Sequence, residues 1–575
     1  MTEYKVNINQ QVNKYLIIMA IIISIGICIN PKNAKAQVEH IPISHPVYMF
    51  LQHCEAKGLL EHFSLSSLPL QRGEVATALR SICSATPQLT ASEKQTLELY
   101  EQEICPELRV NSSVFSSDVP RKDTSSFFSS GLFSEHEKGF YFQDEKNVNV
   151  YAVPLASADL AFRSLDTQSS SMFSVQAGIR VHGTLSNRFG YFMQVTNGSL
   201  ISGDRTLALE DIRLKQNIKF AVLNSDFDFT ESHIRYDYDW FYIGIGRESR
   251  LLGAGFRHHQ FLGQNAPPLD AVFAGARFKQ FEYRFTYASL MSLAIDTNGQ
   301  AIFPNMGIIA GSDKYFPSKT LVMHRAAFRP KWGEIALWES VIYQNRSLDL
   351  GYLNPLSFLK SVEHSLRDRD NSAMGFDFTI RPVKGLSIKG SYLLDDLIFS
   401  KIGTDYWGNK AAYSVGALYA FPSWNIGAEY AKVYPYTYSH FNVQNSMTSD
   451  GQIITGSLAP NSDELSLFGS LWYGNRYPIQ FLLSYRRHGA NQVETINGKD
   501  TLIVNHGGDA LYCKRPNDSM DAPFLAGIVL ETFKTQMSIG YEIIRGFNIQ
   551  AAYQFRKTGK ENVHIAQISL RFEDF

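Results

Sequence analysis

Apolar and polar residues alternate along much of this chain, and the clearest example lies between residues 371 and 396. Met374, Phe376, Phe378 and Ile380 share one parity, while Asp377 and other polar or small residues occupy the other. After a short turn at 382–385, the alternation resumes and continues to residue 394. Because successive side chains of a strand point to opposite faces, this pattern predicts two strands joined by a tight turn. A long polar loop, two strands of about ten residues and a short turn form the repeating unit of a transmembrane β-barrel.

The same unit recurs from about residue 148 to the end of the chain. Further strands with one apolar face are predicted at 173–181, 189–195, 281–287, 413–421, 424–430 and 547–555. Their polar faces carry side chains such as Arg180, His182 and Arg284, which the core of a soluble β-sandwich would exclude. At roughly 25 residues per strand with its loops, this region makes about 16 to 18 antiparallel strands. The sequence therefore predicts an all-β transmembrane barrel over residues 148–575.

Long loops and short turns alternate between these strands. The long loops fall at about 251–269, 292–319, 345–370, 397–410, 435–463 and 488–523. In bacterial barrels the short turns are periplasmic and the long loops extracellular, so we expect a bacterial outer-membrane protein in contact with lipid. The final Phe575 resembles the terminal aromatic residue that such barrels present to the barrel-assembly machinery. Its parity differs from that of Phe572, which indicates a bulge or a variant form of the signal.

The first 36 residues read as a secretory signal peptide. Lys5 and Lys14 supply positive charge, residues 15–29 are largely apolar, and Ala34-Lys35-Ala36 fits the cleavage pattern. The alternative is a retained signal anchor, but the apolar run is shorter than the roughly 20 residues that span a bilayer. We therefore expect export and cleavage before residue 37.

Residues 37–110 have helical rather than strand periodicity. Ser44 is placed to cap a helix ending at Gly58, a second apolar stripe covers 75–83, and Thr90 with Glu93 forms a capping box before a third helix. The sequence predicts a small α-helical bundle, either a free periplasmic domain or a plug under the barrel. Residues 111–147, rich in Ser and Asp at first, read as a linker or a segment lying in the lumen.

Cysteine and charge content narrow the possibilities further. Cys54, Cys83 and Cys105 lie in the bundle, where they form either one disulfide or small buried side chains. A net charge of -1 argues against a nucleic-acid partner. An aromatic content of 13% suits the two aromatic girdles of a membrane barrel.

The chain carries no sequence motif of a known catalytic site, so we expect neither an enzyme nor a cofactor. Asp395 and Asp396 are adjacent and should point to opposite faces of a strand, unlike a glycosidase pair. The loop histidines at 258, 259 and 506 more often meet solvent than a metal. Asp368, Asp370 and Asn371 could hold Ca²⁺, although the arginines between them favour an ion-paired loop. We expect no metal site.

Two stretches rich in Gly, Pro, Asn and Asp interrupt the strand pattern. The first contains GR at 246–247, LLGAG at 251–255 and NAPPLD at 265–270, and the second contains YLNP at 352–355, Glu363, DNSAMGFDF at 370–378 and Asp395-Asp396. Both resemble the Wzi family of capsule-assembly outer-membrane proteins, as does the order of helical segment and barrel. The resemblance implies an 18-stranded barrel, a helical bundle closing its periplasmic end, and lectin-like attachment of capsular polysaccharide.

Sugar binding requires aromatic faces for stacking and polar groups for the hydroxyls. The loop residues with this chemistry are Tyr352, Asn354, Arg367, Arg369, Asp370, Tyr406 and Trp407. For Tyr406 and Trp407 the alternative is the outer aromatic girdle. For the whole protein the alternative to a polysaccharide-binding function is a general diffusion porin or a polysaccharide export channel.

Overall fold

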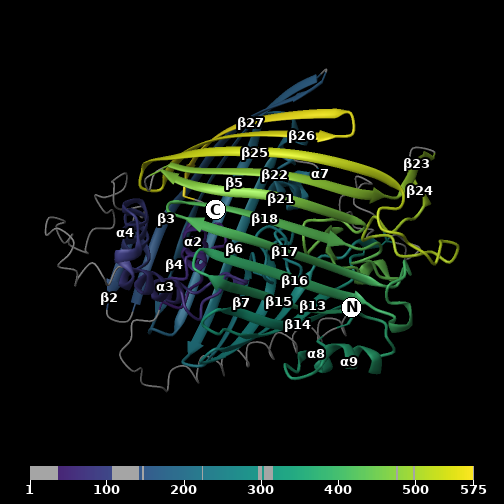
Figure 1. Ribbon diagram of the computed structural model, residues 1–575, viewed down its shortest axis with the longest axis horizontal. Helices are drawn as coiled ribbons and strands as arrows, with labels where there is room; N and C mark the ends of the chain where they lie inside the picture. The colour runs from purple at the N-terminus through teal and green to yellow at the C-terminus, as the bar shows by residue number, and fades with distance from the viewer. Residues whose placement is uncertain are drawn as a thin grey trace, which may run out of the picture.

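The computed structural model describes residues 37–105, 141–145, 148–166, 168–222, 225–295, 301–302, 315–346, 348–473, 477–496 and 499–573. Within these ranges, 18 antiparallel strands close into a barrel (Figure 1), which confirms the predicted fold class. The wall strands are β3 Val148–Leu165, β4 Gln168–Leu185, β5 Phe189–Gly203, β6 Asp226–Tyr238, β7 Phe241–Glu248, β9 Leu269–Phe278, β10 Phe281–Leu290, β13 Lys319–Phe328, β14 Gly333–Gln344, β15 Asn371–Val383, β16 Leu386–Asp396, β17 Lys410–Phe421, β18 Trp424–Val433, β21 Ser462–Tyr473, β22 Tyr477–Ala490, β25 Ile528–Ile544, β26 Phe547–Thr558 and β27 Glu561–Phe572.

Each wall strand pairs with its neighbours in chain order, and the last closes onto the first. Along β27 and β3 the register places Val563 opposite Leu165 and Phe572 opposite Ala156. Strand β2, Tyr141–Glu145, extends this edge by pairing with the start of β3, so part of the predicted linker 111–147 is a strand. The predicted signal peptide at 1–36, the linker residues 111–140 and 146–147, and Phe575 lie outside the described residues.

The wall is polar inside and apolar outside, the reverse of a soluble protein. On β15, Asp377 and Thr379 are fully buried, whereas Phe376 between Gly375 and Asp377 is 44% exposed. On β4, Arg180 and His182 are likewise buried in the lumen. In a barrel that is surrounded by lipid, the polar side chains of each strand face the lumen and the apolar side chains face outward. The strand periodicity is therefore confirmed in both its spacing and its direction.

Three helices form the predicted N-terminal bundle: α2 Val47–Ala56, α3 Arg72–Ser84 and α4 Ala91–Ile104. The capping box of Thr90 and Glu93 is present, but α2 is preceded by Pro46 rather than capped by Ser44, which lies too far upstream. None of the helices in the described part of the chain is long and apolar enough to cross a membrane. In the described part of the chain no disulfide joins Cys54, Cys83 and Cys105; Cys54 and Cys105 are buried, while Cys83 is exposed.

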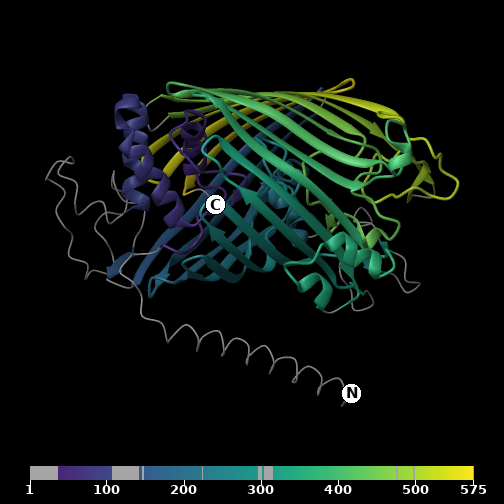
Figure 2. The ribbon, with the colours of Figure 1, turned by 60° about the horizontal axis from the view of Figure 1, so that its bottom comes forward.

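The bundle lies in the barrel end that carries the short turns, opposite most of the loops (Figure 2). The backbone amide of Gly385, in the turn between β15 and β16, donates to the carbonyl of Ala56 over 2.9 Å. Thr90 contacts Ser423 in the turn between β17 and β18 through their hydroxyls, 3.2 Å apart. These contacts to separate turns hold the bundle as a plug across this end.

Charge pairs join the bundle to the lumen wall. Glu55 of α2 is fully buried between Arg381 and Lys389, with N–O distances of 3.1 and 3.4 Å. Within the bundle, burial opposes ionisation of Glu93, but hydrogen bonds from His53 and Lys57 outweigh it and lower the pKa of Glu93 to about 2. Buried charges of both signs therefore meet where the plug contacts the wall.

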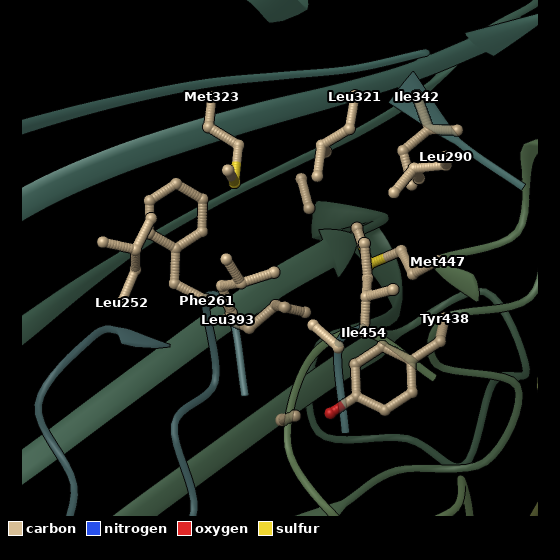
Figure 3. Close-up of a cluster of buried hydrophobic side chains, with 14 of the residues drawn as sticks. Leu252, Phe261, Leu290, Leu321, Met323, Ile342, Leu393, Tyr438, Met447 and Ile454 are labelled. Carbon is tan, nitrogen blue, oxygen red and sulfur yellow. The ribbon is translucent and has the colours of Figure 1, made fainter. Parts of the chain in front are cut away.

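A loop predicted to be extracellular folds into the lumen and extends the plug. In the connection 249–268 between β7 and β9, strand β8, Leu251–Leu252, pairs with β1, Ser67–Leu68, of the bundle. Phe261 of this loop stacks on Trp338 of β14 with 4.2 Å between ring centroids. Around them lies a cluster of buried apolar side chains in the lumen (Figure 3). The loop's apolar residues make lumen burial more favourable than exposure to water.

The remaining elements lie in the loops. They are α5 Arg205–Ala208, α6 Ile212–Gln216, α7 Ile218–Val222, α8 Leu350–Leu353, α9 Leu359–Ser365, three short 3₁₀ helices at Thr86–Gln88, Phe399–Lys401 and Val443–Asn445, and the strand pairs β11 Ala294–Ile295 with β12 Ala301–Ile302, β19 Thr448–Ser449 with β20 Gln452–Ile453, and β23 Gln492–Ile496 with β24 Lys499–Val504. The connection with α5, α6 and α7, at 204–225, is a long loop that the sequence pattern did not predict.

Replacing Glu55 with Ala should loosen the plug, because it leaves Arg381 and Lys389 buried without their counter-charge. Breaking a buried ion pair from one side costs about 3–5 kcal/mol. We expect a lower melting temperature in detergent and faster proteolytic release of residues 37–105. The control is Glu61→Ala, whose partner Lys331 and own side chain are both exposed, and it should change neither quantity. Equal effects of the two variants would contradict this account of plug docking.

Candidate functional site

Three connections meet at the long-loop end of the barrel: 397–409, 434–461 and 491–527. The amide of Trp407 donates to the carbonyl of Met520 over 3.0 Å, and that of Ala522 donates to Asp405 over 2.7 Å. The amide of Tyr436 donates to the carbonyl of Gly507 over 2.9 Å. These backbone bonds fasten the loops to one another, so that they form one surface.

A cavity of about 710 Å³ opens among these loops, and we call it the rim pocket. Its wall consists of Tyr436, residues 503–506, 515–519, 521–522 and Ala526. The polar members provide two amides, an imidazole, a guanidinium, two carboxylates and two hydroxyls. Groups of these kinds donate to and accept from sugar hydroxyls, so the pocket has the chemistry for a polar, hydroxyl-rich ligand.

One ion pair organises the wall of the rim pocket. The guanidinium of Arg515 donates to both oxygens of Asp518 and to the carbonyls of Leu502 and Ile503, at 2.9–3.2 Å. The hydrogen bond to Asp518 raises the pKa of Arg515. Burial opposes the ionisation of Asp518, but the bonds from Arg515 outweigh it and lower the pKa of the carboxyl group. Both groups are therefore charged at neutral pH and fixed in position.

Of the seven residues predicted for sugar binding, Tyr406 and Trp407 lie beside the rim pocket. Tyr406 forms an isolated antiparallel bridge with Asp521 of the pocket wall. The Trp407 ring meets Tyr436 edge-on at 5.8 Å and has the ammonium groups of Lys410 and Lys514 within 6 Å of its centroid. Both residues belong to the loop surface rather than to a strand, unlike the members of an aromatic girdle.

The other five predicted residues lie elsewhere, on the connection 345–370, which is folded against the outside of the barrel. Tyr352 is fully buried, and its hydroxyl donates to Asp370 over 2.7 Å. Asp370 is also buried and pairs with Arg346 at 2.6 Å. Tyr352 and Asp370 therefore cannot contact a polysaccharide, because each is engaged beneath this connection. Asn354, Arg367 and Arg369 are exposed, but the structure does not bring them to the rim pocket.

Groups considered for catalysis or metal binding have structural roles. Asp395 accepts from the amide of Tyr438, while Asp396 pairs with Lys410. The register shifts between Leu394 and Asp396, so the strict alternation that the prediction assumed does not hold at this pair. The histidines at 258 and 259 are buried in the inward-folded loop rather than solvated, and His258 contacts Glu464 at 3.1 Å. Asp368, Asp370 and Asn371 do not converge on one point, since Asn371 turns inward to donate to the carbonyl of Asn445.

Another trio, His40, His233 and Glu248, lies close enough to share a metal ion. His40 contacts Glu248 at 2.9 Å and Arg235 at 2.7 Å, and Arg250 pairs with Glu248. The guanidinium groups of Arg235 and Arg250 already face the imidazole and the carboxylate. We therefore interpret this trio as a further set of polar contacts between the N-terminal segment and the wall.

A second cavity, of about 330 Å³, lies inside the lumen beneath α5 and α6. It is bounded by β3, β4 and β25–β27, on the side of the barrel away from the apolar cluster of the plug. Its polar lining includes Gln176, Gln536, Gln554 and Gln567 with Asp159, Glu210, Asp211, Arg213, Lys534 and Arg571. We call it the lumen cavity.

Sequence reasoning missed the residues that build the rim pocket. It identified the loop 488–523 as long but predicted no sugar-binding residue within it. The signal that could have drawn attention to this loop is its density of Asn, Asp, Arg and Gly between residues 505 and 521. That density alone does not distinguish a binding loop from a solvated one.

No protein-family model matches the sequence. No curated protein matches it either. Among solved structures, Wzi of Escherichia coli, described as an outer membrane protein involved in group 1 capsule assembly and a carbohydrate-binding β-barrel, aligns with a TM-score of 0.52 and 11% identity, over 94% of this chain and 100% of that chain. OccAB4 of Acinetobacter baumannii aligns with a TM-score of 0.42 and OccK2 (OpdF) of Pseudomonas aeruginosa with 0.41, each at 8% identity, covering 74% of this chain and 97% of theirs. The chain thus has a Wzi-like fold, as the sequence motifs led us to expect.

Replacing Asn461 with Ala should disorder the rim pocket. The buried Asn461 amide donates to the carbonyls of Gly489 and Ala526 and accepts from the amide of Leu525, all within 2.9 Å. Loss of three such bonds destabilises the loop by about 3 kcal/mol, at about 1 kcal/mol each. Proteolysis of the loop 505–527 should accelerate, and the control Asn517→Ala, at an exposed position, should leave the rate unchanged. Similar rates for both variants would refute this role.

Proposed function

We propose that this chain is an outer-membrane protein that binds a surface polysaccharide at the rim pocket and so retains or organises it as a capsule. The observation that carries the proposal is that three loops join, above a plugged lumen, into an open pocket with sugar-binding chemistry. The likeness of fold to a barrel described as carbohydrate-binding supports it.

The proposal includes an orientation in the membrane. The apolar exposed parity of the strands supports insertion in the bacterial outer membrane, and barrels of this kind keep their short turns periplasmic. The bundle, which sits at the short turns, would then face the periplasm, and the rim pocket would face the outside. A capsular or other surface polysaccharide is long and highly hydrated, so it can reach the rim pocket without entering the barrel. The role is binding and not catalysis.

The proposed ligand contacts differ from those expected from the sequence. Tyr406 and Trp407 remain candidates because they border the rim pocket, and exposed polar residues of its wall, such as Asn517 and Asp521, join them. Trp407 has an indole N–H that is buried, and no hydrogen-bond partner is found for it among the described residues. A small shift of the loops on binding would give this N–H an acceptor.

The double variant Asn517→Ala/Asp521→Ala tests the proposal. Loss of one neutral and one charged hydrogen bond should weaken binding of the purified protein to the cell's own surface polysaccharide by at least about tenfold. In cells the variant should move polysaccharide from the cell-attached fraction to the medium. The matched control, Gln492→Ala/Glu494→Ala, removes an amide and a carboxylate from the nearby hairpin of β23 and β24, outside the pocket, and should behave as wild type. Unchanged binding and unchanged retention in the test variant would sink the proposal.

A diffusion or export channel is the second candidate, and the lumen cavity favours it, because its amide and charged lining suits a polar solute. Planar-bilayer recordings distinguish the two functions. We expect no steady ion conductance from the whole protein, since the N-terminal bundle, the inward-folded loop and the connection with α5 and α6 all occupy parts of the lumen. Stable conductance of the intact protein would favour the channel instead.

A further inference from the structure

The connection 348–370, which contains α8 and α9 and which we call the flap, lies on the outer surface of the barrel (Figure 1). Tyr352 and Leu359 of the flap pack against Val341 and Tyr343 of β14. Those two β14 residues share their parity with Leu337, which is 66% exposed on the outer wall. The flap therefore covers the part of the outer wall nearest the long-loop end, and the wall below it is bare.

Directional hydrogen bonds hold the flap in this position. The outward-facing carboxylate of Glu339 accepts from the backbone amide of Leu359, with both oxygens at 3.0 Å. The hydroxyl of Ser372, on the same face of β15, donates to Glu363 of α9. Polar groups on a lipid-facing wall would otherwise lack partners. The flap satisfies them, so its docking is built into the wall.

The opposite side of the flap is apolar and uncovered. Leu350 is 77% exposed, Leu356 is 90% exposed and Phe358 is 53% exposed. In the neighbouring connection between β16 and β17, Phe399 is 82% exposed. In water each such side chain would forfeit about 25 cal/mol per Å² of apolar area left unburied. These residues instead continue the apolar outer wall of the barrel. Leu337, lower on that wall, is exposed to the same surroundings as they are.

Two cations stand at the end of the flap. Arg367 and Arg369 are exposed, and within the described residues neither guanidinium has an ion-pair partner. Asn445 donates to the carbonyl of Arg369 over 3.0 Å, which places this residue at the rim where β15 begins. The flap thus has apolar side chains beside the lipid-facing wall and arginines next to them, toward the rim. A segment that lies in a membrane interface has this arrangement.

We propose that the flap is an interfacial anchor: Leu350, Leu356 and Phe358 insert into the outer leaflet of the outer membrane, and Arg367 and Arg369 bind the anionic head groups of its lipids. The continuity of the exposed apolar residues with the lipid-facing wall identifies lipid as the occupant. A polysaccharide has no acyl chain to cover Leu356. The inference goes beyond polysaccharide binding and depends only on insertion of the barrel in the membrane.

Depth-dependent quenching tests the apolar half of the proposal. Leu356→Cys, in a protein with Cys83 and Cys513 replaced by Ser, is labelled with an environment-sensitive fluorophore and reconstituted in vesicles containing lipids with brominated acyl chains. The control carries the label at Asn517→Cys, an exposed site in the rim pocket. We expect at least about threefold stronger quenching at 356 than at 517. Equal quenching overturns the proposal, as does protection of 356 that depends on protein concentration and not on lipid, which would assign the flap to a second copy of the chain.

Thermal melting tests the role of the arginines. Wild-type protein is compared in phosphatidylcholine vesicles and in vesicles with one-third phosphatidylglycerol, alongside Arg367→Gln/Arg369→Gln and the control Lys557→Gln/Lys560→Gln at the rim across the barrel. The anionic lipid should raise the melting temperature of the wild type and the control, and the arginine variant should lose at least half of this shift while still binding polysaccharide. An undiminished shift, or loss of polysaccharide binding in the arginine variant, would overturn the assignment.

Discussion

A closed barrel whose inward side chains are polar must satisfy them inside its own lumen, and the rest of this structure depends on that requirement. Glu39 shows how it is met: burial opposes its ionisation, yet the hydrogen bond from His182 and the charge of Arg72 lower its pKa to about 2. Arg325 on β13 lies fully buried between Asp377 and Glu334 of the wall and also donates to Ser67 of the bundle. The bundle is thus more than a stopper, because the buried charges of the wall and of the bundle complete one another.

The loops at the long-loop end of the barrel are connected to the bundle through a series of contacts. The bundle pairs with the inward-folded loop through β1 and β8, and the amide of Gly263 in that loop donates to the carbonyl of Ile454 in the next connection, 434–461. The same connection supplies Tyr436 to the rim pocket. A continuous series of contacts therefore runs from the helices at the short turns to the pocket at the other end. The plug and the pocket therefore belong to one connected set of loops.

Sequence periodicity predicted the wall well, because a period of two specifies which side chains share a face. The periodicity could not specify which other parts of the chain cover each face of the strands. The Leu251–Leu269 loop contains adjacent histidines and arginine, and so reads as solvated, yet His258 is fully buried because Glu464 of the wall and Ser457 provide partners for its two ring nitrogens. Tyr352 was expected to be an open stacking surface, but the outward-facing residues of β14 bury it. Such outcomes depend on contacts between residues far apart in the chain, which one sequence does not reveal.

The position of the plug also has a consequence for the order of assembly. His40 and Gln71 contact β6 through His233 and Asp237, and Val38 contacts β4 through Thr184. These strands come early in the chain, well before β27, which must pair with β3 to seal the cylinder. A docking place for the bundle can therefore exist on an open, curved sheet, before the final seam forms. If the seam closed first, the bundle would have to enter through the mouth and displace water from around buried charges, so early docking gives the simpler route to the finished protein.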